Sequence, residues 1–273
     1  MPTLRLIALS LALLVSACAG PRVLHEDVLE WQERESVARP EASRGARKTE
    51  LDEVRTLRAA DELARARQLA LALAAEHPVD FEALLAASIA ESDQVFLLPE
   101  DDKESRNLAA SSALWFARRA VLSAHLAPSV DAQLAWTLGT TTHLQPMGER
   151  AAHARETLEC ADRALTVEPD NATALATVAL VNLRLETLPW IASLMASGLP
   201  ESSLAKAEAS ARSAVKAVPS RENRLILAKV LVAAERKAEA RAELEAALAA
   251  APQHPRDHAL ESSVRALLKE LRD

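Results

Sequence analysis

The sequence predicts an all-α protein, built as an irregular α-solenoid of antiparallel helix pairs. Ala and Leu, which both favour helices, make up 58 and 44 of the 273 residues. With only 5 Gly, the chain has few of the turns that an all-β sandwich or a Gly-rich nucleotide-binding loop requires. Apolar residues recur at steps of three and four between stops that contain Pro. We therefore do not expect a β-rich or Rossmann-type enzyme.

The first 17 residues have the pattern of an export signal. Arg5 precedes an apolar run from Leu6 to Val15, which is shorter than the roughly 20 residues that span a bilayer as a helix. Small residues and Cys18 follow this run directly. We expect residues 1–17 to be a signal peptide that is absent from the mature protein.

The order of an apolar run, small residues and Cys18 also resembles the bacterial lipobox. That resemblance implies cleavage before Cys18 and lipidation of its sulfur. Several acyl chains, at about 0.8 kcal/mol per buried CH₂, hold a protein stably on a bilayer. Ala19 stands where inner-membrane lipoproteins often have Asp, which favours the outer membrane of a bacterial envelope, facing the periplasm. The alternative is an ordinary secretory signal that is cleaved near Ala17 or Ala19.

Residues 18–48 are predicted to be a flexible tether. From Gly20 onward this stretch is rich in Arg, Glu and Ser and contains two Pro. Residues 49–273 are predicted to be one helical-repeat domain. With Cys18 acylated, its one thiol is Cys160, which we expect to be buried as a small apolar residue on a helix.

Apolar stripes and Pro residues predict the helices of this domain in order. One stripe from Leu51 to Leu73 indicates a helix that ends before Pro78, and Asp80 is placed to cap the next helix. Further stops with Pro fall at residues 127–129, 168–171, 218–220 and 251–253. Stripes between these stops predict about ten helices joined by short turns.

Small residues recur at a fixed spacing before Pro in the second half of the chain. The three sets are Ala161, Ala164 and Pro169, then Ala207, Ala211, Ala214 and Pro219, then Ala240, Leu244, Ala247 and Pro252. This spacing resembles the second helix of the tetratricopeptide repeat (TPR), a helix–turn–helix of 34 residues. Leu227 and Ala228 stand at the matching positions of a first helix. The resemblance implies a TPR-like fold, best matched from Arg155 onward, and the alternative is a generic Ala-rich helical bundle.

Two further family resemblances overlap with this one. Residues 180–271, with Leu188-Pro189-Trp190-Ile191 and Leu227-Ala228-Lys229-Val230, resemble the repeat region of the regulator of microtubule dynamics family. An exported bacterial lipoprotein would meet no microtubules, so this resemblance implies a fold and not a function. The whole mature chain, with its loop from Phe96 to Asp102, is similar to the T component of tripartite ATP-independent periplasmic (TRAP) transporters. That similarity implies a role in ligand delivery.

Motifs for catalysis or for cofactors are weak. His254 and His258 flank Asp257, but a Pro and an expected turn fall within the cluster, so we predict no metal site. His143 and His153 flank a loop, where a role as an acid–base pair is less expected than a structural one. We predict no enzyme and no cofactor. The net charge of −7 also argues against binding to nucleic acid.

Large side chains are rare in this chain and are the candidates for partner binding. They are Trp115, Trp136, Trp190, Ile191, Leu194 and Met195. The last four lie within residues 188–200, a run without charge that is a partner site if exposed and core if buried.

The sequence thus predicts a lipid-anchored, periplasm-facing scaffold. We expect its concave face to bind another cell-envelope protein or its peptide tail, and the protein to assist assembly of an envelope machine. The alternative function is an accessory lipoprotein of a periplasmic solute transporter, holding a small apolar ligand between helices.

Overall fold

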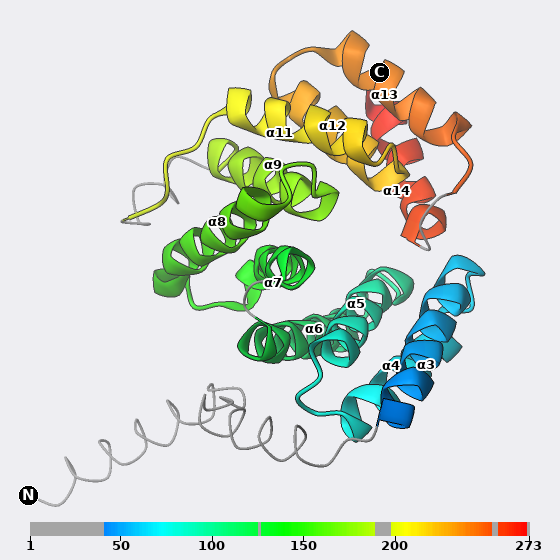
Figure 1. The fold of residues 1–273 in the computed structure, drawn as a ribbon. Coiled ribbons are helices and arrows are strands. Elements are labelled where there is room, and N and C mark those ends of the chain that lie inside the picture. Colours follow the sequence, from blue (N-terminus) through cyan, green and yellow to red (C-terminus); the bar gives the residue numbers. More distant parts are fainter. Residues whose placement is uncertain (1–40, 125–126, 189–197, 253–255, 272–273) are drawn as a thin grey trace, which may run out of the picture.

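A computed structural model describes residues 41–124, 127–188, 198–252 and 256–271. All regular structure within these ranges is helical, as Figure 1 shows, which confirms the predicted all-α class. The helices are α3 (Glu41–Ala59), α4 (Leu63–Glu76), α5 (Phe81–Leu97), α6 (Lys103–Ser123), α7 (Pro128–Thr141), α8 (Arg150–Val167), α9 (Ala172–Glu186), α11 (Leu204–Ala217), α12 (Arg221–Ala233), α13 (Lys237–Ala249) and α14 (Arg256–Glu270), with 3₁₀ turns η1 (Thr142–Leu144) and η2 (Met147–Glu149). None of the helices in the described residues combines the length and the apolar composition that crossing a membrane requires.

Helices adjacent in the sequence pack side by side and form two layers. The outer layer holds α4, α6, α8, α11 and α13. Each of the last four contacts the inner helix before it and the inner helix after it, and α4 packs between α3 and the inner helix α5. The inner layer runs from α5 to α7, α9, α12 and α14, each packed on the next. This alternation is the arrangement of a helical-repeat solenoid.

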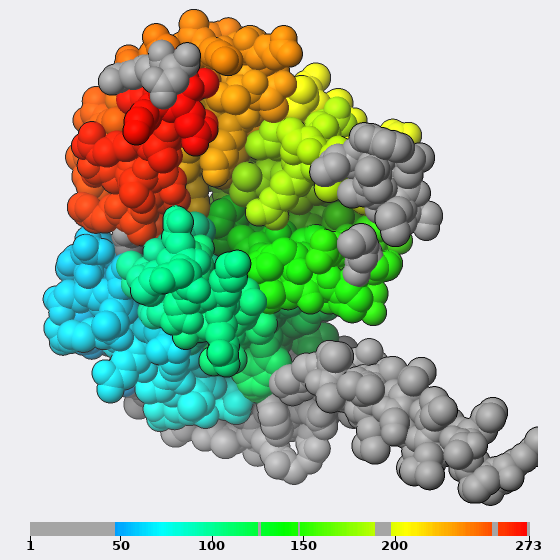
Figure 2. Space-filling view, turned by 180° about the vertical axis from the view of Figure 1, so that it is seen from behind, coloured from blue at the N-terminus to red at the C-terminus, as the bar shows by residue number. Residues whose placement is uncertain are grey.

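The inner layer closes on itself. Helix α14 packs back against α5, so the five inner helices from α5 to α14 form a continuous circuit (Figure 1). Seen from behind in Figure 2, the C-terminal helix (red) lies directly against the N-terminal helices (blue and cyan). Two ends of the repeat array that are far apart in the sequence are therefore neighbours in space.

Small residues let the helices approach closely at the positions that resemble a TPR. Ala207, Ala211 and Ala214 of α11 have no solvent exposure, and neither do Ala240 and Ala247 of α13. Because Ala has no side-chain atom beyond Cβ, a neighbouring helix can pack directly on such a face. The predicted contact faces of these outer helices are confirmed.

Polar side chains cap several helices at the predicted places. The Asp80 carboxylate accepts a hydrogen bond from the Ala83 amide at 3.0 Å, and the Asn171 side chain accepts one from the Ala174 amide at 3.0 Å. Such caps satisfy amides that have no partner inside the helix. Asp80 confirms the predicted start of α5.

The first apolar stripe is divided between two helices, whereas the sequence predicts a single helix there. Asp61 adopts a left-handed conformation with φ 62°, between the end of α3 and the start of α4. The Glu62 amide donates to the Leu57 carbonyl and the Asp61 amide to the Arg58 carbonyl, the pattern of a Schellman cap. The prediction of one helix is wrong because the chain turns at Asp61. The turn was not predicted because neither Gly nor Pro stands there.

The start of the helical domain is also earlier than the predicted boundary. Helix α3 begins at Glu41, so residues 41–48 of the predicted tether belong to a helix. The predicted signal peptide, Cys18 and the other tether residues up to position 40 lie outside the described residues.

Candidate functional site

Arg256, the first residue of α14, links three inner helices at the point where the circuit closes. Its guanidinium lies 3.4 Å from Asp93 of α5 and 3.2 Å from Glu222 of α12. It also lies over two aromatic rings, 5.3 Å from the centre of Phe96 and 5.0 Å from that of Trp136. Cation–π contact and ion pairing in a buried place together hold α14 on the inner layer.

Helix α5 places two buried carboxylates beside Arg residues of the first helix pair. Asp93 accepts a hydrogen bond from Arg58 of α3 at 2.8 Å, and Glu91 accepts one from Arg67 of α4 at 2.9 Å. Burial raises the pKa of Glu91, and the positive charge of Arg67 opposes that shift. These pairs connect the first repeat to the inner layer, so we assign them a structural role.

Among the described residues, two cations of the inner layer form no ion pair with a carboxylate. Arg184 of α9 and Lys229 of α12 are both exposed to water, yet protein surrounds them closely enough that partial loss of hydration lowers the pKa of each. The charge of Arg184 lowers the pKa of Lys229 further, and Glu222 opposes this effect. We call Arg184 and Lys229 the inner cation pair.

Each member of the inner cation pair is a single charge within an apolar helical run. Arg184 stands between Leu183 and Leu185, and Lys229 lies in the run from Leu225 to Val232. A lone cation in such a run is the signal that would have revealed them. Neither member of the pair was predicted as a site residue, and neither was Arg256, because the predicted candidates were large apolar side chains.

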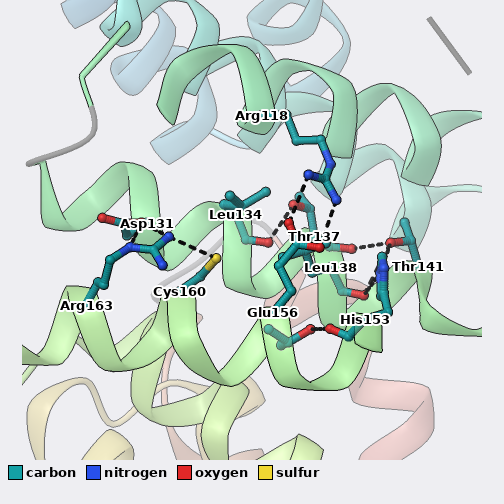
Figure 3. Close-up of polar contacts among 11 residues, drawn as sticks. Arg118, Asp131, Leu134, Thr137, Leu138, Thr141, His153, Glu156, Cys160 and Arg163 are labelled. Atoms are coloured by element: carbon teal, nitrogen blue, oxygen red, sulfur yellow. Dashed lines mark hydrogen bonds and ion pairs between the residues drawn. The ribbon is translucent and has the colours of Figure 1, made fainter. Parts of the chain in front are cut away.

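Figure 3 shows titratable residues where α7 packs against α8, together with Arg118 of α6. His153 Nε2 donates to the Leu138 carbonyl at 2.9 Å and lies 3.3 Å from Thr141 Oγ1, while the exposed His143 contacts Asn107 instead. Burial lowers the pKa of His153. The two His side chains thus contact different residues and do not converge on one site.

Cys160 is buried on α8, as the sequence predicts. Its side chain is 1% exposed, and its sulfur accepts a hydrogen bond from Arg163 at 3.2 Å (Figure 3). The same guanidinium donates to Asp131 at 2.7 and 3.0 Å. Burial raises the pKa of the Cys160 thiol, which keeps it protonated and unreactive at neutral pH.

The predicted partner residues have different surroundings. Trp136 is 5% exposed beneath Arg256, so its ring belongs to the core. Trp115 is half-buried, and its ring meets Phe116 edge to face at 4.8 Å. The remaining predicted residues, Trp190, Ile191, Leu194 and Met195, lie outside the described residues.

The described residues contain no cluster of side chains that could bind a metal ion. Within the described ranges, no three His, Cys, Asp or Glu side chains gather closely enough to hold a metal ion. Of the residues in the weak His cluster, His254 lies outside the described residues, Asp257 is buried and His258 is exposed.

An open cleft of about 610 Å³ lies between α13 and α14, with Glu245, Arg265 and Lys269 at its walls.

Solved structures with the same architecture are TPR proteins. A thermophilic TPR protein from Thermus thermophilus superposes with a TM-score of 0.57 at 20% identity, covering 82% of this chain and 98% of that one. The pilF protein of Pseudomonas aeruginosa gives a TM-score of 0.50 at 12% identity, covering 85% and 90% of the two chains. These likenesses show a TPR-like fold and confirm the predicted solenoid.

A family model extends this result over most of the chain. No curated protein sequence matches significantly. The family model "Regulator of microtubule dynamics protein 1-3" matches residues 50–272, which includes the first half, where the sequence resembled a TPR poorly. The chain belongs to the regulator of microtubule dynamics protein 1-3 family.

Proposed function

We propose that this protein is a lipid-anchored, periplasm-facing scaffold that binds another cell-envelope protein and assists assembly of an envelope machine. The observation that carries the proposal is the inner layer, where helices from successive pairs contribute to one face. A segment of a partner that lies on such a face contacts several repeats at once, which is how helical-repeat proteins bind peptides.

The N-terminal pattern supports the location. The apolar run before Cys18, too short to span a bilayer, favours export followed by lipid attachment. Microtubule dynamics, named in the family's description, is not part of the proposal, because an exported bacterial lipoprotein would not meet microtubules. The fold therefore supports the role as a binding scaffold, and the N-terminal residues support the proposed location in the cell envelope.

The membrane anchor is tested by fractionating cells that express the Cys18→Ser variant. We expect the wild-type protein in the outer-membrane fraction, labelled by a radioactive fatty acid, and the variant without label. Wild-type protein that carries no label would contradict the anchor and favour an ordinary secretory signal.

The partner is tested by crosslinking intact cells and recovering the native acylated protein for mass spectrometry. We expect one envelope protein to be recovered in stoichiometric amount, and to be lost from a Trp190→Ala variant. The matched control is Leu108→Ala, which removes an apolar side chain that is 69% exposed on the outer helix α6. Recovery of a small molecule and no protein would instead support the alternative role in solute transport.

A further inference from the structure

Helix α7 is enclosed on every side, although it belongs to the inner layer that would face a bound partner. Every residue from Val130 to Gly139 is buried. Because a helix turns once in about 3.6 residues, such an unbroken run leaves no side of α7 open to solvent. In Figure 1 α7 lies among its neighbours, with α5, α8 and α9 packed around it. The inner face at α7 is therefore covered in the closed circuit.

Arg256 of α14 covers α7 at the ring of Trp136. Its guanidinium lies 5.0 Å from the centre of that ring and 5.3 Å from the centre of the Phe96 ring of α5. The carboxylate of Asp93, also on α5, lies 3.4 Å from the same guanidinium. We call Asp93, Phe96 and Trp136 the guanidinium site.

Two kinds of contact hold α14 in place. Leu260, Val264 and Leu268 are buried in one apolar cluster with residues of α12 and α13. On the other side, Phe96 is the one residue of α5 in this cluster among the described residues, and the ion pair with Asp93 lies beside it. A buried ion pair adds little net stability, whereas each buried apolar side chain adds to it. We therefore expect α14 to part from α5 more readily than from α12 and α13.

Such a separation divides the partners of Arg256 between two sides. Glu222 of α12, 3.2 Å from Arg256, stays with α14. Asp93 stays with α5, where its Oδ2 accepts a hydrogen bond from Arg58 at 2.8 Å. Its Oδ1 accepts no hydrogen bond among the described residues, and the Arg256 Nε atom lies 3.4 Å from it.

The chemistry of the guanidinium site determines which group can replace Arg256 there. A carboxylate beside two aromatic faces suits a guanidinium, which pairs with the carboxylate and stacks on a ring at the same time. An ammonium group is a compact point charge and cannot match both contacts with one plane. The guanidinium site is therefore suited to the side chain of an Arg.

We propose that an Arg side chain on a segment of the partner protein replaces Arg256 in the guanidinium site and opens the contact between α5 and α14. The inference rests on the proposed function and adds how the partner reaches the inner layer. Arg256 competes with the partner for this site, so the closed circuit limits binding to segments that carry Arg.

The site is tested by titration calorimetry on the purified full-length acylated protein in detergent. A peptide with the sequence of residues 252–264 stands in for the partner's segment, and the reference is the same peptide with Arg256→Met. We expect the protein variant Arg256→Met to bind the unchanged peptide about tenfold more tightly than the wild type does, because the internal competitor is gone. The reference peptide should bind neither protein.

Combining Asp93→Asn with Arg256→Met should abolish this gain, because the peptide's guanidinium loses its carboxylate. The matched control is Arg265→Met, which removes an exposed Arg from the same helix and should leave binding at the wild-type level. Hydrogen exchange in α7 gives a second measurement. It should be faster in Arg256→Met than in the wild type, and the unchanged peptide should slow it again.

Circular dichroism checks that Arg256→Met is folded. If it is not, Arg256→Lys takes its place, because Lys keeps the charge but cannot pair and stack at once, and it should also bind the peptide more tightly than the wild type. Equal binding of the two peptides by the variant, or equal binding of the unchanged peptide by the variant and the wild type, would overturn the inference. A gain that survives Asp93→Asn would overturn it as well.

Crosslinking in cells separates this inference from the proposed function. We expect Arg256→Met to recover more of the partner than the wild type, and the combined variant to recover less than Arg256→Met. A partner recovered equally from all three leaves the scaffold function intact and overturns the guanidinium site. No partner from any of the three, together with the expected peptide binding, contradicts the scaffold function and supports the site.

Discussion

Single residues on α8 show how burial sets the chemistry of a titratable group. His153 is enclosed between α7 and α8, where its Nε2–H is bonded to the Leu138 carbonyl. Burial lowers its pKa from the ordinary value of 6.5, while the charges of Glu149 and Glu156 favour protonation and that of Arg118 opposes it. The neutral imidazole is therefore part of the folded structure.

Acidification should destabilise the protein through His153. Its pKa is lower in the folded state than in the unfolded state, so its contribution to the free energy of unfolding is complete above pH 6.5. That contribution is lost as the pH falls from 6.5 towards the lowered pKa of the folded state. We expect His153→Gln, whose amide can still donate to Leu138, to lose less stability than the wild type in urea melts between pH 7 and pH 5.

The control for this prediction is His143→Gln, because His143 is exposed and its ring contacts Asn107 at the surface. Its urea midpoints should follow those of the wild type at every pH. A pH dependence that is unchanged in His153→Gln would show that other groups cause the acid destabilisation.

At the level of elements, one turn geometry recurs in two repeats that are far apart in the sequence. Glu235 between α12 and α13 has φ 61°, close to the 62° of Asp61 between α3 and α4. The Arg236 amide donates to the Leu231 carbonyl and the Glu235 amide to the Val232 carbonyl, which repeats the cap at Asp61. Both turns thus place a residue with a side chain where Gly is usual.

Replacing Glu235 by Gly should stabilise the protein by about 0.5–1 kcal/mol, because relief of left-handed strain exceeds the added entropy of unfolded Gly. Urea denaturation measures the effect. The matched variant Glu245→Gly, in the middle of α13, should destabilise by about 1 kcal/mol. A loss of stability in Glu235→Gly would mean that the Glu235 side chain stabilises this turn.

On the scale of the whole molecule, closure of the inner layer depends on a few long-range contacts. Arg256 reaches Asp93 and Phe96, more than 150 residues earlier in the sequence, and its ion pairs lie in a largely buried place. Removing one partner from such a group leaves the other charges buried without compensation.

Arg256→Met should therefore lower the free energy of unfolding by about 2–4 kcal/mol, and it should speed hydrogen exchange in α5 and α14. Arg265→Met is the control, since Arg265 is exposed and pairs with Glu261 one turn away, so its loss should cost less than about 1 kcal/mol. Equal stability of the two variants would show that apolar packing alone closes the circuit.

Local interactions explain why much of the fold was predictable. Asp80 caps α5 through the amide of Ala83, three residues away, and Ala207, Ala211 and Ala214 repeat at the spacing of helical turns. Such features involve residues within one or two turns of each other. The break at Asp61 escaped prediction because its left-handed residue is not Gly.

The candidate site was much less predictable. Trp136 was a candidate for partner binding, but Arg256, 120 residues later in the sequence, covers its ring. Arg184 carries no motif, and its hydrogen bond to the Gly139 carbonyl depends on how α9 packs against α7. These outcomes depend on contacts between helices, and no spacing within one helix reports them.

The sequence by itself determined the helical class, the small faces of the outer helices and the caps at Asp80 and Asn171. Helical periodicity, capping and targeting patterns are local properties that a chain carries before it folds. Only the tertiary structure decided that α14 returns to α5 and that Trp136 is core. Each of these depends on the small rotation between successive helix pairs, which accumulates over the whole array and leaves no mark at any single position.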